Sequence, residues 1–260
     1  MTLEQKVALI TGGSSGIGKA TAHRLATAGA RIGVLGRTPD EVESVTEAIE
    51  SSGGEAMSLL ADVSDAEAMQ DAIEQLVSRW QRLDVVFANA GINGVWAPLG
   101  ELTPQDWDKT INVNLKGTFL TVKYALPYLK RDGGSVIVTS SINGTRVFSN
   151  SGATAYACSK AAQVAFVKMA ALELAKHGIR VNVICPGAIE SQISDNTTKE
   201  DLEHIREPVE FPEGQIPLTD GKPGEAEQVA DLVLFLASDA ASHITGTEVW
   251  IDGAQSLLRG

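Results

Sequence analysis

A tyrosine and a lysine stand four residues apart in a segment that has the pattern of a helix. In Tyr156-Ala-Cys-Ser-Lys160 the two side chains would share one helix face. A free tyrosine has a pKa of about 10, which is a poor match for proton transfer at neutral pH, but a nearby ammonium lowers that pKa. The pair therefore predicts a general acid/base, although the spacing alone is common by chance.

A glycine-rich segment near the N-terminus predicts a binding site for phosphate. An apolar run at residues 7–10, expected to be a buried strand, leads into Thr-Gly-Gly-Ser-Ser-Gly-Ile-Gly at residues 11–18 and then into a helix. At such a turn the free N–H groups and the positive end of the helix dipole face an anion. The two serine hydroxyls add possible contacts to phosphate or ribose. The predicted binding residues are Gly12, Ser14, Ser15, Gly16, Ile17 and Gly18.

These candidates need a scaffold, and the chain alternates short apolar strands with helical segments. The further expected strands are residues 30–36, 56–61, 83–88, 135–139, 179–185 and 246–253. The alternation predicts a doubly wound α/β fold with a seven-stranded parallel sheet and helices on both faces. Right-handed crossovers would bring the carboxyl ends of the strands to one edge, where ligands bind.

Composition excludes several classes of protein. The 260 residues carry a net charge of −12, which argues against nucleic acid as a partner. No apolar run approaches the roughly 20 residues of a membrane helix, so we expect no membrane partner. Two cysteines are too few for a disulfide framework, and four histidines show no ligand spacing, so we expect a cytoplasmic protein without a metal site.

The Thr-Gly-x-x-x-Gly-Ile-Gly segment and the Tyr-x-x-x-Lys pair together resemble the short-chain dehydrogenase/reductase family. The resemblance extends from residue 7 to about residue 253. It implies one Rossmann-type domain over residues 1–260 that interconverts a ketone and a secondary alcohol with a nicotinamide cofactor. It also implies a small-molecule substrate and a homo-oligomer, either a tetramer or a dimer.

The resemblance assigns four catalytic residues, which occur here in the family's order: Asn114, Ser141, Tyr156 and Lys160. Tyr156 is the expected acid/base, Lys160 lowers its pKa, and Ser141 polarises the carbonyl. In the family the asparagine lies in a kinked helix and its backbone holds a water that links the lysine to solvent.

Two of these assignments required a choice between neighbours. Ser141 is preferred to Ser140 because Ser-Ile-Asn-Gly at residues 141–144 matches the family's Ser-x-x-Gly. Asn114 is preferred to Asn112 because Asn114 immediately precedes Leu115.

The end of the second strand predicts the type of cofactor. An acidic residue normally lies there and binds the ribose 2′-hydroxyl of NAD. Here Arg37 and Thr38 follow Gly36, and a guanidinium is suited to a 2′-phosphate. We therefore expect NADP(H) rather than NAD(H); the alternative is that Arg37 is an ordinary solvated arginine.

The resemblance adds further cofactor contacts. Asp62 would bind the adenine amino group, Val63 would pack on the ring, and Ser191 would reach the nicotinamide carboxamide. The remaining cofactor residues are Asn89, Ala90, Gly91, Tyr156, Lys160, Pro186, Gly187 and Ile189.

Two segments are expected to be loops beside the substrate. Residues 92–103 contain Trp96, a candidate for the substrate pocket, and residues 190–223 have the polar, proline-containing composition of a lid. The acidic side chains of this lid disfavour an anionic substrate such as an acyl-carrier thioester.

Two other functions explain part of the pattern. A cofactor-binding sensor would use the glycine turn but needs no proton relay. A nucleotide-dependent methyltransferase would also use that turn, yet it leaves Tyr156 and Lys160 without a role.

Overall fold

The computed structural model describes residues 1–190, 197–205 and 216–258, and a parallel sheet forms its centre. Seven strands lie in the order β3-β2-β1-β4-β6-β7-β9, and each neighbouring pair is parallel. The strands are β1 (Val7–Thr11), β2 (Arg31–Gly36), β3 (Glu55–Leu60), β4 (Val85–Ala88), β6 (Gly134–Thr139), β7 (Ile179–Pro186) and β9 (Glu248–Ile251). The seven-stranded sheet predicted from the alternation of elements is confirmed.

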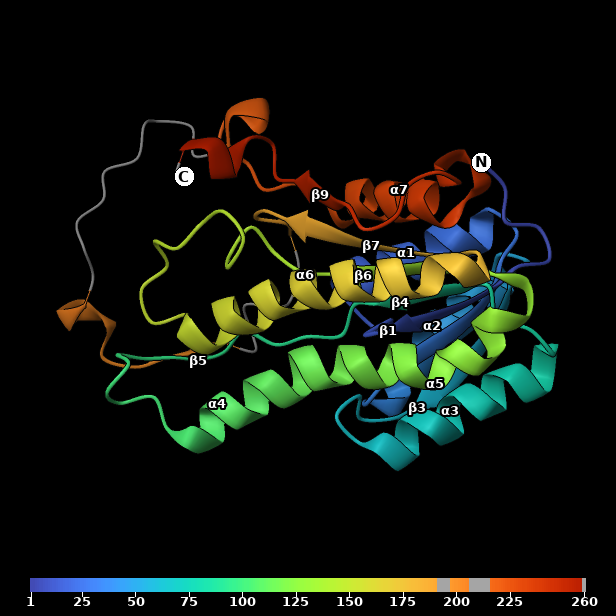
Figure 1. Ribbon diagram of the computed structural model, residues 1–260, viewed down its shortest axis with the longest axis horizontal. Helices are drawn as coiled ribbons and strands as arrows, with labels where there is room; N and C mark the ends of the chain where they lie inside the picture. The colour runs from blue at the N-terminus through green and yellow to red at the C-terminus, as the bar shows by residue number, and fades with distance from the viewer. Residues whose placement is uncertain (191–196, 206–215, 259–260) are drawn as a thin grey trace.

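Helices cover both faces of this sheet, as Figure 1 shows. One face packs against α1 (Gly16–Thr27), α2 (Pro39–Ser51) and α7 (Ala226–Ala237). The other packs against α3 (Ala66–Trp80), α5 (Gly117–Asp132) and α6 (Thr154–Leu174). The remaining helical segments are α4 (Pro104–Ile111), a π-helical turn (Asn112–Lys116) and 3-10 turns at Ala175–His177, Leu202–His204, Pro217–Thr219, Asp239–Ala241 and Gln255–Leu258.

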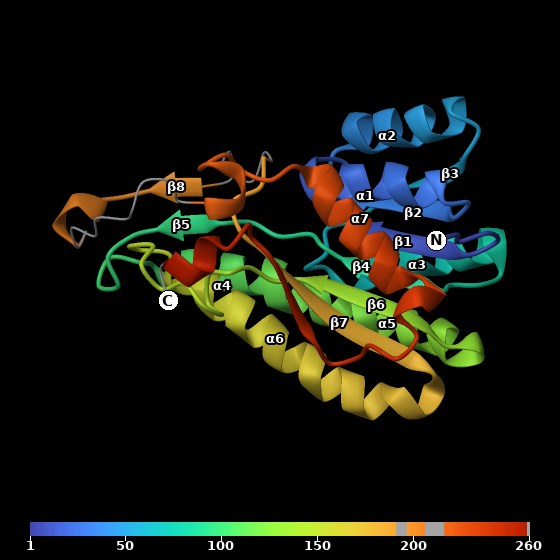
Figure 2. The same cartoon turned by 90° about the horizontal axis from the view of Figure 1, so that it is seen from above.

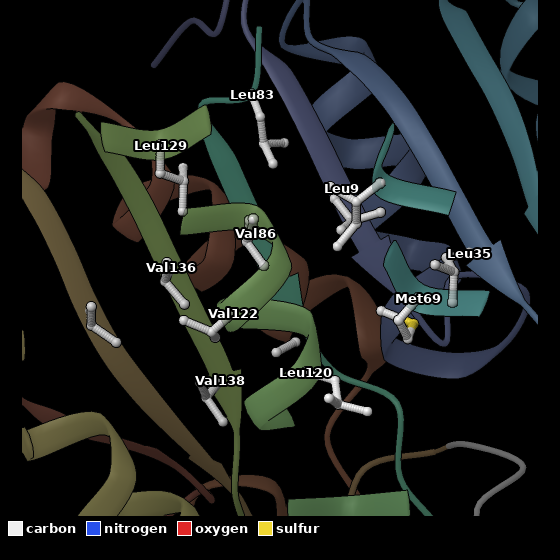
Figure 3. Close-up of a cluster of buried hydrophobic side chains, with 14 of the residues drawn as sticks. Leu9, Leu35, Met69, Leu83, Val86, Leu120, Val122, Leu129, Val136 and Val138 are labelled. Atoms are coloured by element: carbon white, nitrogen blue, oxygen red, sulfur yellow. The ribbon is translucent and has the colours of Figure 1, made fainter. Parts of the chain in front are cut away.

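The apolar runs of the strands supply both layers of the core. Successive side chains of a strand point to opposite faces, so Leu9 of β1 packs in the layer with α3 and α5 while Ile10 packs in the layer with α1 and α7. Figure 3 shows the first layer, in which Met69 of α3 and Leu120 of α5 approach the sheet. Burial on both faces explains why these strands are continuous apolar runs.

The carboxyl end of the sheet carries two short strands that the sequence did not indicate. β5 (Gly94–Trp96) pairs in parallel with β8 (Thr197–Lys199), and Figure 2 shows the two side by side. Both were expected to be loops. Three-residue strands are too short to show an alternating pattern, so this expectation was wrong for a physical reason. Residues 191–196 and 206–215 of the expected lid lie outside the described residues.

The helical segment that follows residue 103 is interrupted. α4 and α5 are joined by the π-helical turn, in which the N–H of Gly117 bonds to the carbonyl of Asn112. A π turn changes the direction of backbone groups within a helix, and such turns are frequent at functional sites. Asn114 lies in its centre and is fully buried.

Within the described ranges, none of the helices is both long and apolar enough to cross a membrane. Over the same ranges, no group of three or more His, Cys, Asp or Glu side chains is placed to hold a metal ion.

Candidate active site

The N-terminus of α1 has the properties of a phosphate site. Ser15 is the N-cap residue but makes no side-chain cap bond, and the first turn contains no acidic residue. Gly12 has φ of +64°, and a Cβ on Gly18 would lie 2.0 Å from the Gly12 carbonyl oxygen. The turn is therefore as tight as only glycine allows, with backbone N–H groups left to face an anion.

Asn89 fixes this turn relative to the neighbouring strands. Its amide nitrogen donates to the carbonyl of Thr11 at 3.2 Å, and its amide oxygen accepts from Thr139 Oγ1 at 3.1 Å. The Thr11 hydroxyl in turn accepts from the backbone N–H groups of Asn89 and Ala90. One asparagine thus connects β1, β4 and β6 directly beneath the glycine turn.

A cavity of about 500 Å³ opens over the carboxyl ends of these strands. It brings together predicted residues that are distant in sequence: Gly12, Ser15, Gly16, Ile17, Asn89, Ala90, Gly91, Ser141, Tyr156, Lys160, Pro186, Gly187 and Ile189. Trp96 also lines it, as expected for a substrate-pocket residue, together with Asn93, Asn143 and Asn150. Ser191 lies outside the described residues.

Tyr156 is buried at the floor of this cavity, with 7% of its surface exposed. Burial raises the pKa of the phenol, and a hydrogen bond with the Ser141 hydroxyl lowers it in part. Ser141 Oγ also accepts from the backbone N–H of Asn143 at 3.1 Å, which fixes its position. The phenol therefore keeps its proton at neutral pH in this structure.

Lys160 lies one helical turn beyond Tyr156 on α6 and is also buried. Its Nζ donates to the Thr139 carbonyl at 2.9 Å and lies 5.5 Å from the centre of the Tyr156 ring. Burial lowers the pKa of Lys160 to about 8, an effect that the Cys185 thiol opposes. The expected lowering of the tyrosine pKa by this lysine is not found: burial raises the pKa of Tyr156, and the group that lowers it in part is Ser141.

Two adjacent serines have different environments. Ser140 Oγ donates to the Lys160 carbonyl at 2.8 Å, so this side chain faces the backbone of α6. Ser141 instead contacts Tyr156. Ser141 is therefore the serine whose hydroxyl adjoins the phenol.

Asn114 does not line the cavity, but its hydrogen bonds hold residues that form the cavity wall. Its Oδ1 accepts from the N–H of Ile92 at 2.8 Å, while Nδ2 donates to the Ile92 carbonyl and to Ser159 Oγ. Ser159 Oγ donates to the Tyr156 carbonyl at 2.7 Å. The asparagine thus connects the π turn to the loop after β4 and to the turn of α6 that carries Tyr156.

A second cavity of about 310 Å³ adjoins the first at the glycine turn. It contains the residues expected to bind the adenosine half of a dinucleotide: Ser14, Arg37, Thr38, Asp62 and Val63. Arg37 Nη1 lies 3.8 Å from Asp62 Oδ2. Burial acts to raise the pKa of Asp62, but hydrogen bonds from Ser64 and the charge of Arg37 outweigh it, and the pKa is lowered.

Two residues of the site were missed from the sequence. The Glu41 carboxylate lines the smaller cavity and accepts from Ser14 Oγ at 3.1 Å. Gln255 Oε1 accepts from the N–H of Ala188 at 2.8 Å, which fixes the loop after β7. Glu41 could have been noticed in the sequence, because it is an acidic residue in the first turn of the helix that follows Arg37. Nothing in the sequence around Gln255 indicates that its side chain contacts the loop after β7.

Comparisons with known proteins agree with this architecture. A family model described as enoyl-(acyl carrier protein) reductase matches residues 12–254. The 3-oxoacyl-(acyl-carrier-protein) reductase FabG of Thermotoga maritima is 38% identical over 254 residues, covering 97% of this chain and 98% of that protein. The crystal structure of a 3-ketoacyl-ACP reductase from Sinorhizobium meliloti 1021 superimposes with a TM-score of 0.95 at 59% identity, covering 97% of this chain and 100% of that one. A short chain dehydrogenase from Burkholderia cenocepacia J2315 in complex with NADP gives a TM-score of 0.85 at 32% identity, covering 97% and 98%.

Proposed function

The chain belongs to the short-chain dehydrogenase/reductase family, and we propose that it interconverts a ketone and a secondary alcohol with Tyr156 as general acid/base. The observation that carries the proposal is that Ser141, Tyr156 and Lys160 line one cavity, with the Lys160 ammonium over the Tyr156 ring. The cavity also contains the glycine turn.

The chemistry follows from the positions of these three side chains. When bound, the nicotinamide supplies the hydride in reduction and accepts it in oxidation. The Ser141 hydroxyl hydrogen-bonds the substrate oxygen and stabilises the charge that develops on it. Tyr156 Oη donates a proton to this oxygen in reduction and withdraws one in oxidation. Lys160, held by the Thr139 carbonyl, stabilises the phenolate that remains.

The residues present fit a dinucleotide phosphate cofactor, and we favour NADP(H). The uncapped turn at Ser15 suits the pyrophosphate, and Arg37 with Thr38 suits a 2′-phosphate at the rim of the smaller cavity. The side chain of Arg37 is 61% exposed, so it can move toward a phosphate at little cost. The NADP complex of the Burkholderia cenocepacia relative supports this choice.

NAD(H) is the second candidate, and Glu41 is the observation that favours it. Its carboxylate lies beside Ser14 in the same cavity, where it can accept a hydrogen bond from a ribose hydroxyl and repel a 2′-phosphate. Arg37 and Glu41 therefore act in opposite directions on cofactor choice.

For the substrate we favour a neutral ketone. Apart from Lys160, the larger cavity is lined by neutral side chains, with three asparagines and Trp96 at its substrate side. The adjoining segment, residues 197–205, carries Glu200, Asp201 and Glu203 against one cation, Lys199, whose ammonium lies over the Trp96 ring; the excess of carboxylates disfavours an anionic carrier. Two similar proteins are named as acyl-carrier-protein reductases, so thioesters belong in the same assay.

The deciding experiment compares Tyr156→Phe with the wild type. We expect carbonyl-dependent oxidation of NADPH to fall by a factor of about 10² or more, because the proton donor is lost, while cofactor binding stays unchanged. Tyr128→Phe, which alters a tyrosine stacked on Arg131 of α5, is the matched control. Cofactor binding by a wild type that reduces no ketone or thioester would instead indicate a sensor.

We also propose a homo-oligomer. Met169 and Leu172 on α6 are 73% and 83% exposed, and Phe119 on α5 is 44% exposed. Exposed large apolar side chains on neighbouring helices are typical of subunit contacts. Light scattering should give the mass of a dimer or a tetramer.

A further inference from the structure

Two asparagines on the loop between β6 and α6 form a hydrogen-bonded pair beside Ser141. Asn150 Nδ2 donates to Asn143 Oδ1 at 2.8 Å, and both side chains line the larger cavity. The backbone N–H of Asn143 donates to Ser141 Oγ at 3.1 Å. This amide pair, Asn143 with Asn150, therefore borders the place where a substrate oxygen would contact Ser141.

The amide pair is held against the helix that carries the phenol. The turn that contains Asn143 packs closely on α6, since a Cβ on Gly144 would lie 2.2 Å from the carbonyl oxygen of Ala157. The carbonyl of Asn150 accepts from the N–H of Ala153 at 3.3 Å, at the start of the same helix. Both backbones are thus anchored, and a ligand would find the two amides already in place.

The pairing leaves one donor group and one acceptor atom unused. An amide side chain has two N–H donors and one carbonyl oxygen, so Asn143 Nδ2 and Asn150 Oδ1 remain. Neither atom has a hydrogen-bond partner among the residues that the structure describes. Neither is among the buried unpartnered polar atoms, so both are accessible to a ligand. Reversing both amides would exchange the two positions and leave the same donor and acceptor.

The third asparagine of the cavity has a different role. Asn93 Nδ2 donates to Thr197 Oγ1 at 2.7 Å, which ties the loop before β5 to β8. This side chain holds the wall of the cavity together. The amide pair is therefore the better candidate for contact with the substrate.

We propose that the amide pair binds a hydroxyl group of the substrate, so that the substrate is a neutral hydroxyketone and its reduced form a diol. A hydroxyl both donates and accepts, so it satisfies Asn150 Oδ1 and Asn143 Nδ2 together. The ketone oxygen is bound by Ser141 and Tyr156, so this hydroxyl is a second oxygen, on a carbon close to the reacting one. The inference rests on the proposed function and names its substrate class.

The same pair discriminates against other second groups. A carboxylate only accepts hydrogen bonds, so one of its oxygens would face Asn150 Oδ1 with no proton between them. A second ketone would satisfy Asn143 Nδ2 but leave Asn150 Oδ1 unpaired, which lowers affinity. A hydroxyl is the group that uses both free atoms.

The first test measures binding without turnover. An alcohol cannot react when the reduced cofactor, NADPH or NADH, is already bound, so calorimetry on the full chain can compare cyclohexanol with cyclohexane-1,2-diol and cyclohexane-1,3-diol. We expect one diol to bind about tenfold more tightly than cyclohexanol, because two further hydrogen bonds form. Asn143→Leu should remove this difference. If neither diol binds more tightly than cyclohexanol, the inference is overturned, whether or not the protein reduces ketones.

The second test is kinetic and compares cyclohexanone with the hydroxyketone that corresponds to the tighter-binding diol. In the wild type we expect kcat/KM to be about tenfold higher for the hydroxyketone. In Asn143→Leu and Asn150→Leu this ratio should fall to about one. The ratio is taken within one protein, so a displaced Ser141, which slows both reductions, does not change it. A wild-type ratio that persists in both variants would overturn the inference.

Ser149→Ala is the matched control on the same loop. Ser149 precedes Asn150, is exposed and does not line the cavity, so its variant should keep both the ratio and the rate. A wild type that binds a diol selectively but reduces no ketone would refute the proposed function and leave the hydroxyl subsite in place. Equal reduction of the ketone and the hydroxyketone would refute the subsite and leave the proposed function in place.

Discussion

The ammonium of Lys160 lies over the ring of Tyr156, 5.5 Å from its centre. The nitrogen is held there by the Thr139 carbonyl, whereas Ser141 contacts the phenol oxygen. Both ionisable groups are desolvated, so burial shifts the two pKa values in opposite directions, up for the phenol and down for the amine. Relative to water, burial therefore disfavours the charged form of each group, but a pKa of about 8 still leaves Lys160 mostly protonated at neutral pH.

The lowered pKa of Lys160 predicts that stability depends on pH. Between its folded pKa of about 8 and its ordinary value of 10.5, the native state binds fewer protons than the unfolded state. The free energy of unfolding therefore rises with pH across this window, by about 1.4 kcal/mol per unit at most. Urea unfolding at about pH 7.5 and about pH 9 should show a gain of about 1 kcal/mol relative to Lys160→Met.

The comparison with Lys160→Met removes the contributions of other groups. Burial raises the pKa of Cys185 to about 12, which has the opposite sign and acts at higher pH. Tyr156 behaves in the same way. Equal pH dependence in the two proteins would show that Lys160 titrates normally.

A second prediction concerns the tightness of the glycine turn. Gly18→Ala places a Cβ against the Gly12 carbonyl, a clash with backbone that no side-chain rotation relieves. We expect a loss of about 3 kcal/mol or more in the free energy of unfolding, together with weaker cofactor binding. Gly100→Ala is the control, because nothing lies within 4 Å of its added Cβ. Equal stability of the two variants would contradict the geometry described here.

The strands of the sheet were accessible from sequence because the information is local. A strand such as β1 is buried on both faces, so it is a short apolar run, and the turn after it requires glycine at particular positions. The β5–β8 pair was not accessible, because its two strands lie about 100 residues apart and each is only three residues long.

The proposed catalytic residues were expected from the sequence to lie together, but their pKa values could not be predicted from it. Tyr156, Lys160 and Ser141 were identified by spacing and motif, and all three line one cavity. The pKa of Tyr156 is set mainly by burial under segments that are distant in sequence. The spacing of residues does not reveal this burial. The position of Glu41 in the smaller cavity likewise depends on a partner 27 residues away along the chain, Ser14.

The two serines provide a third prediction. In Ser141→Ala we expect kcat/KM for ketone reduction to fall by a factor of about 10² to 10³, because a donor to the developing oxyanion is lost. The variant should also shift the tyrosine limb of the pH profile for alcohol oxidation to higher pH, since Ser141 lowers the pKa of Tyr156. Ser140→Ala, which loses the bond to the Lys160 carbonyl and an interaction with the Cys185 thiol, should leave that limb in place. A reversed order of the two effects would identify Ser140 as the catalytic serine.

The final prediction concerns the opposing charges at the adenosine end. Arg37→Ala should weaken NADPH binding about tenfold or more, because a charge-assisted hydrogen bond contributes about 1.5–3 kcal/mol, and should leave NADH binding nearly unchanged. Glu41→Gln should act in the reverse direction and strengthen NADPH binding, since it removes a carboxylate beside Ser14 while keeping an acceptor oxygen. Arg24→Ala removes an arginine paired with Asp231 on the other side of α1 and controls for net charge. Titration of both cofactors with the four proteins checks this prediction. If the wild type binds NADH more tightly than NADPH, the Glu41 carboxylate has a larger effect on cofactor choice than the Arg37 guanidinium.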